Sequence, residues 1–405
     1  RIFSHQLRAI EVGNELVAKN PLMTQRFTGN RTKPNTNLMH DLHSIEAKMD
    51  RNNTEGLMYV VSYPEIDGSD RIQTMRNGVP FWNNGNVKTP TGQAGTSVSV
   101  ADGEINPLMD LNKSYGRGIG RLRPTSYYTN KIWTSKELKD LRGIYNRDSW
   151  KSPEDLLYNH PNLKKKNDPW YGKNLVKPVA MSVEDTIRCW FSWPHYKLFV
   201  PDPLQTQWAG GETPWYIYRS AEVYLMIAES YYWKNQLQQA ADALNAVRSR
   251  AGADPLTAGD VNIGAILDER ARELYYEENR KSELTRIAYT YAKTGKPCEV
   301  FGGRVYKLDN FSGPGGVNSN IKQEGINFYY DWIMKAGNFY NKGVKHKWAE
   351  YKMSVHHVLW PVPANAINTN IKGVINQNIG YPGAENNVEP LIVPKDKTVL
   401  GPDSK

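Results

Sequence analysis

The sequence of 405 residues carries 51 Lys and Arg against 42 Asp and Glu, a formal net charge of +9, and has a mean hydropathy of −0.64. Its length permits one large domain or two or three small ones, and no stretch approaches the roughly 20 apolar residues that cross a membrane. The positive charge is spread along the chain, apart from the lysine run at 164–166, and no nucleic-acid-binding motif is present, so we expect no nucleic acid partner.

The aromatic composition is informative about ligands. The chain has 24 Tyr and 12 Trp but 9 Phe. Tyr and Trp combine an apolar ring with a polar group, so they can lie at a surface and contact a ligand, or pack half-buried under long loops. The composition leaves both interpretations open.

The cysteine content says little about the compartment. Cys189 and Cys298 are too few for a disulfide framework and do not form a CxxC metal motif. The chain begins at Arg1, inside a helical pattern. We therefore expect that an N-terminal part of the protein, with any targeting segment, precedes this sequence.

In chain order, the spacing of apolar residues predicts a helix over 1–19, ended by an Asn-Pro pair, and a helical segment over 38–50. An apolar run in 56–65 predicts a short β-strand. Residues 66–213 are irregular, first rich in Gly, Asn and Pro and then carrying scattered aromatics. Because loops of this length are usually functional or disordered, we expect 66–213 to be the loop-rich side that faces a ligand.

A helical block follows over about 215–293. Within it, 221–252 indicates two amphipathic helices joined by a tight turn, with Gly252 in a left-handed conformation after the second. The apolar stripe of the first helix begins at Ile217. Small alanines at the crossing would let the backbones approach closely, as in a tetratricopeptide-like pair that stacks on other pairs. Any two antiparallel helices of an α-protein remain the alternative.

Two further helices are expected. One is predicted over 263–279, and we interpret its acidic residues as salt-bridging surface groups. The other lies near 328–353, and the C-terminal part is typical of chain wrapped over a surface. No clean boundary divides the sequence, so we expect a single domain over 1–405, with helices decorated by long loops.

Motifs for catalysis or cofactors are weak. The stretch "GRGIGR" at 116–121 is not the GxGxxG phosphate-binding pattern. His356 and His357 cannot both face one metal from a regular strand, and no HExxH or GxSxG motif occurs. We therefore expect no metal, no cofactor and no enzymatic activity. A carboxylate pair for glycoside hydrolysis stays open, because it is set by space and leaves no motif.

Trp82 is the ligand-binding candidate that the residues themselves single out. It stands in "VPFWNNG", between Pro, Asn and Gly, and this context predicts a large ring exposed on a loop. An exposed ring is a platform on which a ligand can stack. Packing of the ring under the loop is the alternative.

Five stretches, taken in order, resemble the SusD/RagB family of nutrient-binding outer-membrane lipoproteins of Bacteroidetes. They are "GRGIGRLRPTSYYTNKIW" (116–133), "RSAEVYLMIAES" (219–230), "ALNAVRSRAG" (243–252), "ILDERARELYYEENRKSELTR" (266–286) and "LWPVPANAINTNIKGVINQNIGYPG" (359–383). Each motif alone is moderately specific, but the ordered set covers most of the chain and is specific. Ala364 and Ala366 depart from the family, which often has a polar residue and Glu there.

The resemblance implies a mainly α, SusD-like fold in which tetratricopeptide-like helix pairs support long irregular loops. It also implies a non-catalytic, cell-surface protein that captures a glycan and delivers it to a SusC-like TonB-dependent transporter of the outer membrane. The lipid anchor that family members carry near their N-terminus is not part of this sequence. The matching motifs are structural, so they transfer the fold and no ligand-contacting residue.

Under this interpretation, stacking aromatics supply affinity and polar loop residues supply specificity. The candidate ligand-binding residues are Trp82, Asn83, Asn84, Tyr127, Trp150, Trp170 and Tyr171. The net positive charge permits an acidic or sulfated glycan, with Arg117, Arg121 and the lysines at 164–166 as candidate partners. A peptide-binding member of the same family, a glycan-active enzyme and a cytosolic helical-repeat adaptor are the alternatives.

Overall fold

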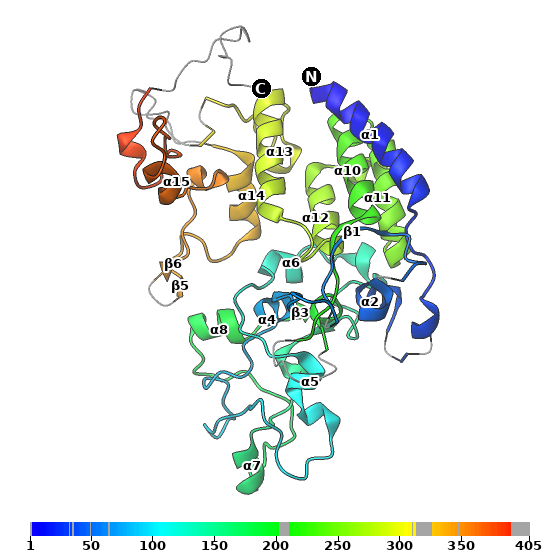
Figure 1. The fold of residues 1–405 in the computed structure, drawn as a ribbon, viewed down its shortest axis with the longest axis vertical. Helices are drawn as coiled ribbons and strands as arrows, with labels where there is room; N and C mark the ends of the chain where they lie inside the picture. The colour runs from blue at the N-terminus through cyan, green and yellow to red at the C-terminus, as the bar shows by residue number, and fades with distance from the viewer. Residues whose placement is uncertain are drawn as a thin grey trace. The chain divides into compact units, whose positions relative to one another are not determined.

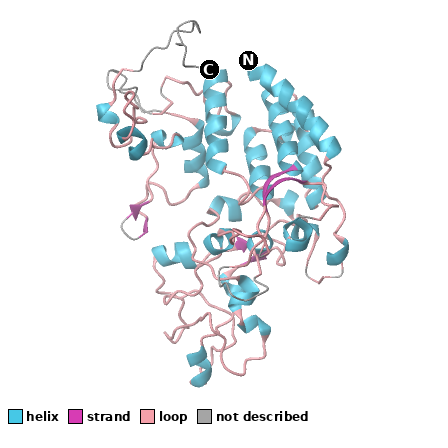
Figure 2. Ribbon diagram, viewed as in Figure 1, coloured by secondary structure: helices cyan, strands magenta, loops and turns pink. Residues whose placement is uncertain are grey.

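The computed structural model is dominated by helices, with short strands and long irregular loops between them (Figure 1, Figure 2). The fold is therefore mainly α, as predicted. The structure describes residues 2–31, 33–34, 36–48, 50–63, 65–201, 210–309, 311–312, 326–346 and 349–389. Within these ranges, no helix combines the length and the apolar character that spanning a membrane would require.

The chain divides into two compact units. The first unit comprises Arg1–Asn279 and Ala336–Tyr351, and the second comprises Arg280–Lys335 and Lys352–Lys405. The expectation of one domain over 1–405 stays a prediction.

The elements of the first unit are mostly short, apart from the helices α1 and α10–α12. Its helices are α1 (Ile2–Lys19), α2 (Leu38–His43), α3 (Ile45–Lys48), α4 (Thr74–Gly78), α5 (Leu111–Tyr115), α6 (Ser126–Asn130), α7 (Pro161–Lys165), α8 (Val183–Cys189), α9 (His195–Leu198), α10 (Ser220–Trp233), α11 (Leu237–Ala251) and α12 (Ile263–Glu273). Its strands pair antiparallel as β1 (Gly56–Val60) with β4 (Trp215–Arg219), β2 (Trp150–Lys151) with β3 (Trp193–Pro194), and β5 (Lys345–His346) with β6 (Ala349–Glu350). Short 3-10 turns lie at Thr28–Asn30, Pro107–Met109, Ser135–Glu137, Pro153–Asp155 and Ala258–Asp260.

Helix α10 is the centre of a helical bundle and contacts α1, α11 and α12, which lie beside it in Figure 1. Small residues allow the close approach: a Cβ on Gly13 of α1 would lie 2.8 Å from Cγ1 of Ile227. Ala228 of α10 and Ala240 of α11 are fully buried. The predicted helix pair is therefore present, and its apolar faces are buried.

The C-terminal end of this helix pair forms as predicted, whereas its first helix begins later than predicted. Gly252 has φ +83°, so its predicted left-handed conformation is confirmed. The turn between the helices is made by Asn235, which also adopts a positive φ of +59°. The inclusion of Ile217 in the helical stripe is wrong, because Ile217 lies in β4 and α10 begins only at Ser220.

Two later helices are shorter than predicted. Helix α12 ends at Glu273 and not at residue 279, and Tyr276 has φ +65°, a value that no α-helix accommodates. The stretch near 328–353 forms a helix only over Phe328–Ala336, and the β5–β6 hairpin follows it.

The acidic residues of α12 were expected at the surface, and this expectation is wrong. Glu269 and Glu273 are fully buried, and Nη1 of Arg142 lies 2.8 Å from a carboxylate oxygen of each. Arg219, also buried, lies 2.9 Å from Glu273. Burial alone would raise the pKa of Glu269, but the guanidinium groups around it, Arg142 foremost, outweigh burial and hold the pKa at about 2.

The long segment between β1 and β4 folds around its own apolar core. Met75, Val79, Trp193 and Leu198 are among its buried residues. The "GRGIGR" stretch packs against this core, where a Cβ on Gly120 would lie 2.1 Å from the Arg188 carbonyl oxygen. These glycines therefore serve close backbone packing in a loop.

The second unit is held together by aromatic rings. Its helices are α13 (Arg280–Thr294), α14 (Phe328–Ala336, whose last residue belongs to the first unit) and α15 (Ala364–Asn368), with 3-10 turns at Glu299–Phe301, Val355–Val358 and Ala384–Asn386. Tyr291 of α13 stacks on Phe328 of α14, with ring centroids 5.1 Å apart, and Phe328 stacks in turn on Trp332.

Candidate functional site

The aromatic residues predicted to bind ligand fall into two separate clusters of the first unit. Trp82, Trp170 and Tyr171 belong to the core of the segment between β1 and β4. Tyr127 and Trp150 belong to a smaller cluster around Tyr128 and Trp133.

The prediction that Trp82 exposes its ring is wrong. Only 1% of Trp82 is exposed, and its Nε1 donates to the carbonyl oxygen of Gly116 over 2.8 Å. Thr96 donates its hydroxyl hydrogen to the Trp82 carbonyl oxygen over 2.6 Å. The loop folds back over the ring, which therefore has no face free for a sugar.

The other cluster also offers little to a ligand. Trp150 is 3% exposed and donates Nε1–H to the Arg142 carbonyl oxygen over 2.7 Å. Tyr127 is half-buried, and its hydroxyl donates to the Asp268 carboxylate over 3.0 Å. The hydrogen bonds of Tyr127 and Trp150 therefore attach α6 and β2 to the core.

Asn83 and Asn84 are half-buried next to Trp82. Oδ1 of Asn84 accepts the backbone N–H of Asn86 over 2.8 Å, which closes a local turn. The side-chain amides of Asn83 and Asn84 remain predicted polar contacts to a ligand.

Trp170 and Tyr171 are brought together on a turn that follows α7. Residues 168–173 form this turn, which we call the two-ring turn, and both rings are half-buried. Oδ1 of Asp168 accepts the Trp170 backbone N–H over 2.9 Å, and the Asp168 carbonyl oxygen accepts that of Tyr171 over 3.1 Å. The Tyr158 backbone N–H donates to the Lys173 carbonyl oxygen over 2.8 Å, which fixes the turn to the buried core.

Both rings are held from behind. The Trp170 ring packs edge-on against Tyr158, with centroids 6.0 Å apart. The Tyr171 hydroxyl donates to Oε2 of Glu104 over 2.6 Å, and Nζ of Lys164 lies 3.6 Å from the same oxygen. Burial raises the pKa of Tyr171 and the hydrogen bond to Glu104 raises it further. The two rings are therefore oriented before any ligand arrives.

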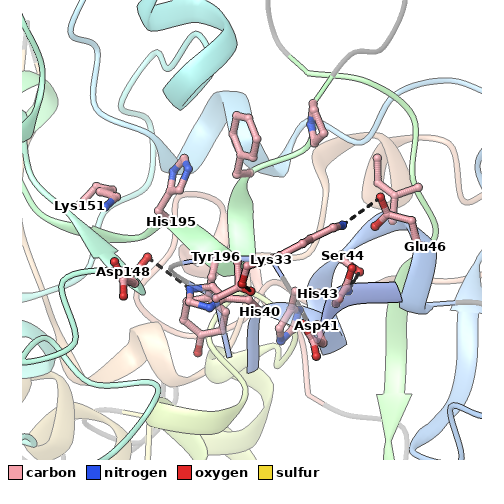
Figure 3. A pocket seen from close by; sticks show the side chains of 15 residues that line it. Lys33, His40, Asp41, His43, Ser44, Glu46, Asp148, Lys151, His195 and Tyr196 are labelled. Atoms are coloured by element: carbon pink, nitrogen blue, oxygen red, sulfur yellow. Dashed lines mark hydrogen bonds and ion pairs between the residues drawn. The ribbon is translucent and has the colours of Figure 1, made fainter. Parts of the chain in front are cut away.

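A pocket of about 450 Å³ lies elsewhere in the first unit, between α2 and α9 (Figure 3). Its volume is within the range of small-ligand sites. We call it the α2–α9 pocket, and it is lined by Asn30, Lys33, Thr36, His40, Asp41, His43, Ser44, Ile45, Glu46, Asp148, Lys151, His195, Tyr196, Phe199 and Pro201.

The histidines of the α2–α9 pocket are neutral. The Asn37 backbone N–H donates to Nδ1 of His40 over 2.9 Å, so the His40 proton is on Nε2, which faces the Asp148 carbonyl oxygen at 3.3 Å. Burial lowers the pKa of His40 to about 4. Burial likewise lowers the pKa of His195 to about 3, with Lys151 adding to the effect.

Three of the five charged side chains that line this pocket, Lys33, Asp41 and Glu46, are in ion pairs. Asp41 accepts both Nε and Nη2 of Arg26, over 2.9 and 2.7 Å, and Lys33 lies 3.5 Å from Glu46, as Figure 3 shows. The pocket therefore presents polar groups and ring edges, together with the side chains of Asp148 and Lys151. Across the part of the chain that the structure describes, no group of three or more His, Cys, Asp or Glu is arranged to hold a metal ion.

Sequence reasoning did not find the α2–α9 pocket. His40 and His43 in the 38–50 segment were the available signal, since i, i+3 residues share a helix face. Asp148 and His195 come from distant parts of the sequence, and nothing local indicates that they lie opposite α2.

A comparison with protein families decides the family of the chain. The model of the SusD family matches residues 71–381. The chain belongs to the SusD family. The match includes the two-ring turn and all helices from α4 to α15. The predicted family is thereby confirmed, whereas no curated protein matches the chain.

Several solved structures are similar to this SusD-family chain. Surface glycan-binding protein A from Bacteroides uniformis has 15% identity and a TM-score of 0.46, covering 93% of this chain and 57% of that one. The protein of the same name from Bacteroides fluxus has 16% identity and a TM-score of 0.43, covering 94% and 60%. A laminarin binding SusD-like protein has 17% identity and a TM-score of 0.33, covering 70% and 52%. The chain thus spans little more than half the length of these proteins.

Proposed function

We propose that this SusD-family chain is a non-catalytic, cell-surface glycan-binding protein whose two-ring turn contacts the sugar. The observation that carries the proposal is the pair of adjacent, half-buried rings, Trp170 and Tyr171, held on a turn that is hydrogen-bonded to the core. Sugar rings present apolar C–H faces that stack on aromatic rings, while their hydroxyls bond to polar groups at the edge.

The energetics of such a site favour rigid rings. By analogy with nucleobases, a stacked aromatic contributes about 1–3 kcal/mol. Trp170 and Tyr171 are already oriented by Tyr158 and Glu104, so little side-chain entropy is lost when a ligand stacks on them. Asn83 and Asn84 remain proposed polar contacts, whereas buried Trp82 and Trp150 leave the proposed site.

Family membership supports the cellular part of the proposal. The glycan is delivered to a SusC-like TonB-dependent transporter, and the protein is held at the outer-membrane surface by a lipid anchor. The contribution of this chain is capture of the ligand, which requires no proton transfer or covalent step.

Affinity electrophoresis tests the proposed ligand class. The purified full-length mature protein is run through gels that contain neutral and acidic polysaccharides, and we expect at least one of them to retard it. The same preparation is titrated with a peptide mixture and assayed for release of reducing sugar. Peptide binding without retardation would replace the glycan by a peptide, and sustained sugar release would contradict the non-catalytic role.

A further inference from the structure

Lysines outnumber carboxylates around the two-ring turn. Lys164 lies at the C-terminal end of α7, Lys165 and Lys166 follow it directly, and Lys173 closes the turn. A second loop, which contains Lys88 and Gln93, is joined to this region: Nζ of Lys166 donates to Oε1 of Gln93 over 3.2 Å. That loop carries a further exposed lysine, Lys88.

Each ring of the turn has an ammonium group over it. Nζ of Lys173 lies 5.1 Å from the centroid of Trp170, and Nζ of Lys164 lies 5.9 Å from that of Tyr171. These distances are those of cation–π contacts. A sugar stacked on either ring would therefore place its substituents within reach of a positive charge.

Most of this positive charge is not neutralised locally. Glu104 pairs with Lys164 at 3.6 Å. Within the described residues, Lys165, Lys166 and Lys173 have no carboxylate oxygen within 4.0 Å. Nζ of Lys166 donates to a neutral amide, whereas the Asp168 carboxylate accepts the Trp170 backbone N–H and the Thr91 hydroxyl and lies in no ion pair with these lysines among the described residues. Because like charges that lie near one another raise the local potential, the surroundings of the two-ring turn attract anions.

We infer that the two-ring turn takes an anionic glycan, one whose sugar units carry sulfate or carboxylate groups. The rings of Trp170 and Tyr171 contact the sugar faces, and the ammonium groups of Lys165, Lys166 and Lys173 contact the anionic substituents. This inference rests on the proposed function and adds the charge of its ligand. The α2–α9 pocket is lined by two lysines and three carboxylates, and its histidines are neutral, so it offers no comparable excess of positive charge.

The test uses polysaccharides that share a backbone and differ in charge. Dextran sulfate is compared with dextran, and chondroitin sulfate with chondroitin and carboxyl-reduced chondroitin, by affinity electrophoresis of the full-length mature protein at several salt concentrations. We expect the anionic member of a set to bind at least tenfold more tightly than the neutral one, with binding that weakens as salt rises. A difference in affinity between chondroitin sulfate and chondroitin reports the contribution of sulfate. A difference between chondroitin and carboxyl-reduced chondroitin reports that of carboxylate.

A matched pair of triple variants locates the charge. Lys165→Ala/Lys166→Ala/Lys173→Ala removes the proposed contacts, and Lys19→Ala/Lys131→Ala/Lys139→Ala removes the same charge at other exposed positions of the first unit. The first variant is expected to lose about tenfold in affinity for the anionic polymer, and the second to bind as the unmodified protein does.

The outcomes separate this inference from the function on which it rests. Equal losses in the two triple variants, or equal affinity for anionic and neutral polymers, would overturn the anionic ligand. If a neutral polymer is bound and Trp170→Ala abolishes that binding, the proposed function stands without the inference. Binding of no polymer by the unmodified protein would overturn both.

Discussion

Tyr171 donates its hydroxyl hydrogen to Oε2 of Glu104 over 2.6 Å, while Oε1 of the same carboxylate accepts the Asn106 backbone N–H over 3.0 Å. The hydrogen bond from Tyr171 lowers the pKa of Glu104, and that from Asn106 lowers it further. One carboxylate therefore ties the ring of the two-ring turn to a separate loop. Preorganisation of this kind would lower the entropic cost of stacking a sugar on the ring.

Removing this hydrogen bond while keeping the ring should weaken glycan binding. In Tyr171→Phe the ring loses its anchor, and we expect a loss of about 1 kcal/mol in affinity, roughly fivefold, with the pKa of Glu104 rising toward its ordinary value. Calorimetry and NMR titration of the Glu104 carboxyl measure the two effects. Tyr145→Phe is the control, because that hydroxyl bonds the Trp133 carbonyl oxygen outside the turn. Unchanged affinity in Tyr171→Phe would show that the anchor is irrelevant to binding.

Trp82→Ala should act on stability. The ring is buried and its Nε1 bonds the Gly116 carbonyl oxygen, so truncation leaves a cavity and an unpaired acceptor. We expect the free energy of unfolding to fall by about 3–5 kcal/mol, as measured by urea denaturation. A Trp82→Ala protein of undiminished stability that no longer bound glycan would return Trp82 to the ligand site.

The contrast between Trp82 and Gly252 shows which features the sequence could predict. Gly252 follows a helix with a clear apolar period, and its left-handed conformation depends on neighbours within one turn. The burial of Trp82 depends on Gly116, a residue 34 positions away whose proximity no local pattern encodes. Helices and the family were therefore predictable, and exposure within the long loops was not.

The buried ion pairs of α12 illustrate the same limit. The sequence shows Glu269 three residues before Arg272, and that pair is present. It does not show Arg142, which arrives from the loop region and turns a surface pair into a buried cluster. The α2–α9 pocket, built from segments around His40 and His195, could not be predicted for the same reason.

The buried cluster predicts how stability depends on pH. The folded-state pKa of Glu269, about 2, lies below the ordinary glutamate value of about 4.3. A depressed carboxylate pKa contributes stability that is fully present above the unfolded value and is lost as pH falls through the folded one. We therefore expect the free energy of unfolding to decline progressively from about pH 4.3 towards pH 2 in urea titrations.

Glu269→Gln provides the control for this pH dependence. At neutral pH the variant leaves Arg142 and Arg248 with one fewer buried counter-charge, and we expect it to cost about 3–5 kcal/mol. Its stability should then depend less on pH between about 4.3 and 2 than that of the unmodified protein. An identical pH profile in both proteins would assign the acid sensitivity to other carboxylates.

Gly252→Ala should destabilise the helix pair. The residue has φ +83°, and an added Cβ would lie 3.0 Å from the Lys139 carbonyl oxygen. We expect a loss of about 1 kcal/mol, measured by thermal or urea unfolding. Gly259→Ala is the matched control, because its φ is not in the left-handed range and the nearest atom, Oγ1 of Thr257, lies at 3.7 Å. Equal stability of the two variants would contradict a conformational role for Gly252.

The most direct test of glycan binding at the two-ring turn compares Trp170→Ala with Trp360→Ala, using the polysaccharide that retards the unmodified protein most. Trp360 is 65% exposed and does not belong to the two-ring turn, so its removal is the matched loss of a surface indole. We expect Trp170→Ala to raise Kd by about fivefold to 150-fold, from about 1–3 kcal/mol of stacking, and Trp360→Ala to leave Kd unchanged. Unchanged affinity in Trp170→Ala, together with loss of binding in Phe199→Ala of the α2–α9 pocket, would contradict this expectation and place the glycan in that pocket.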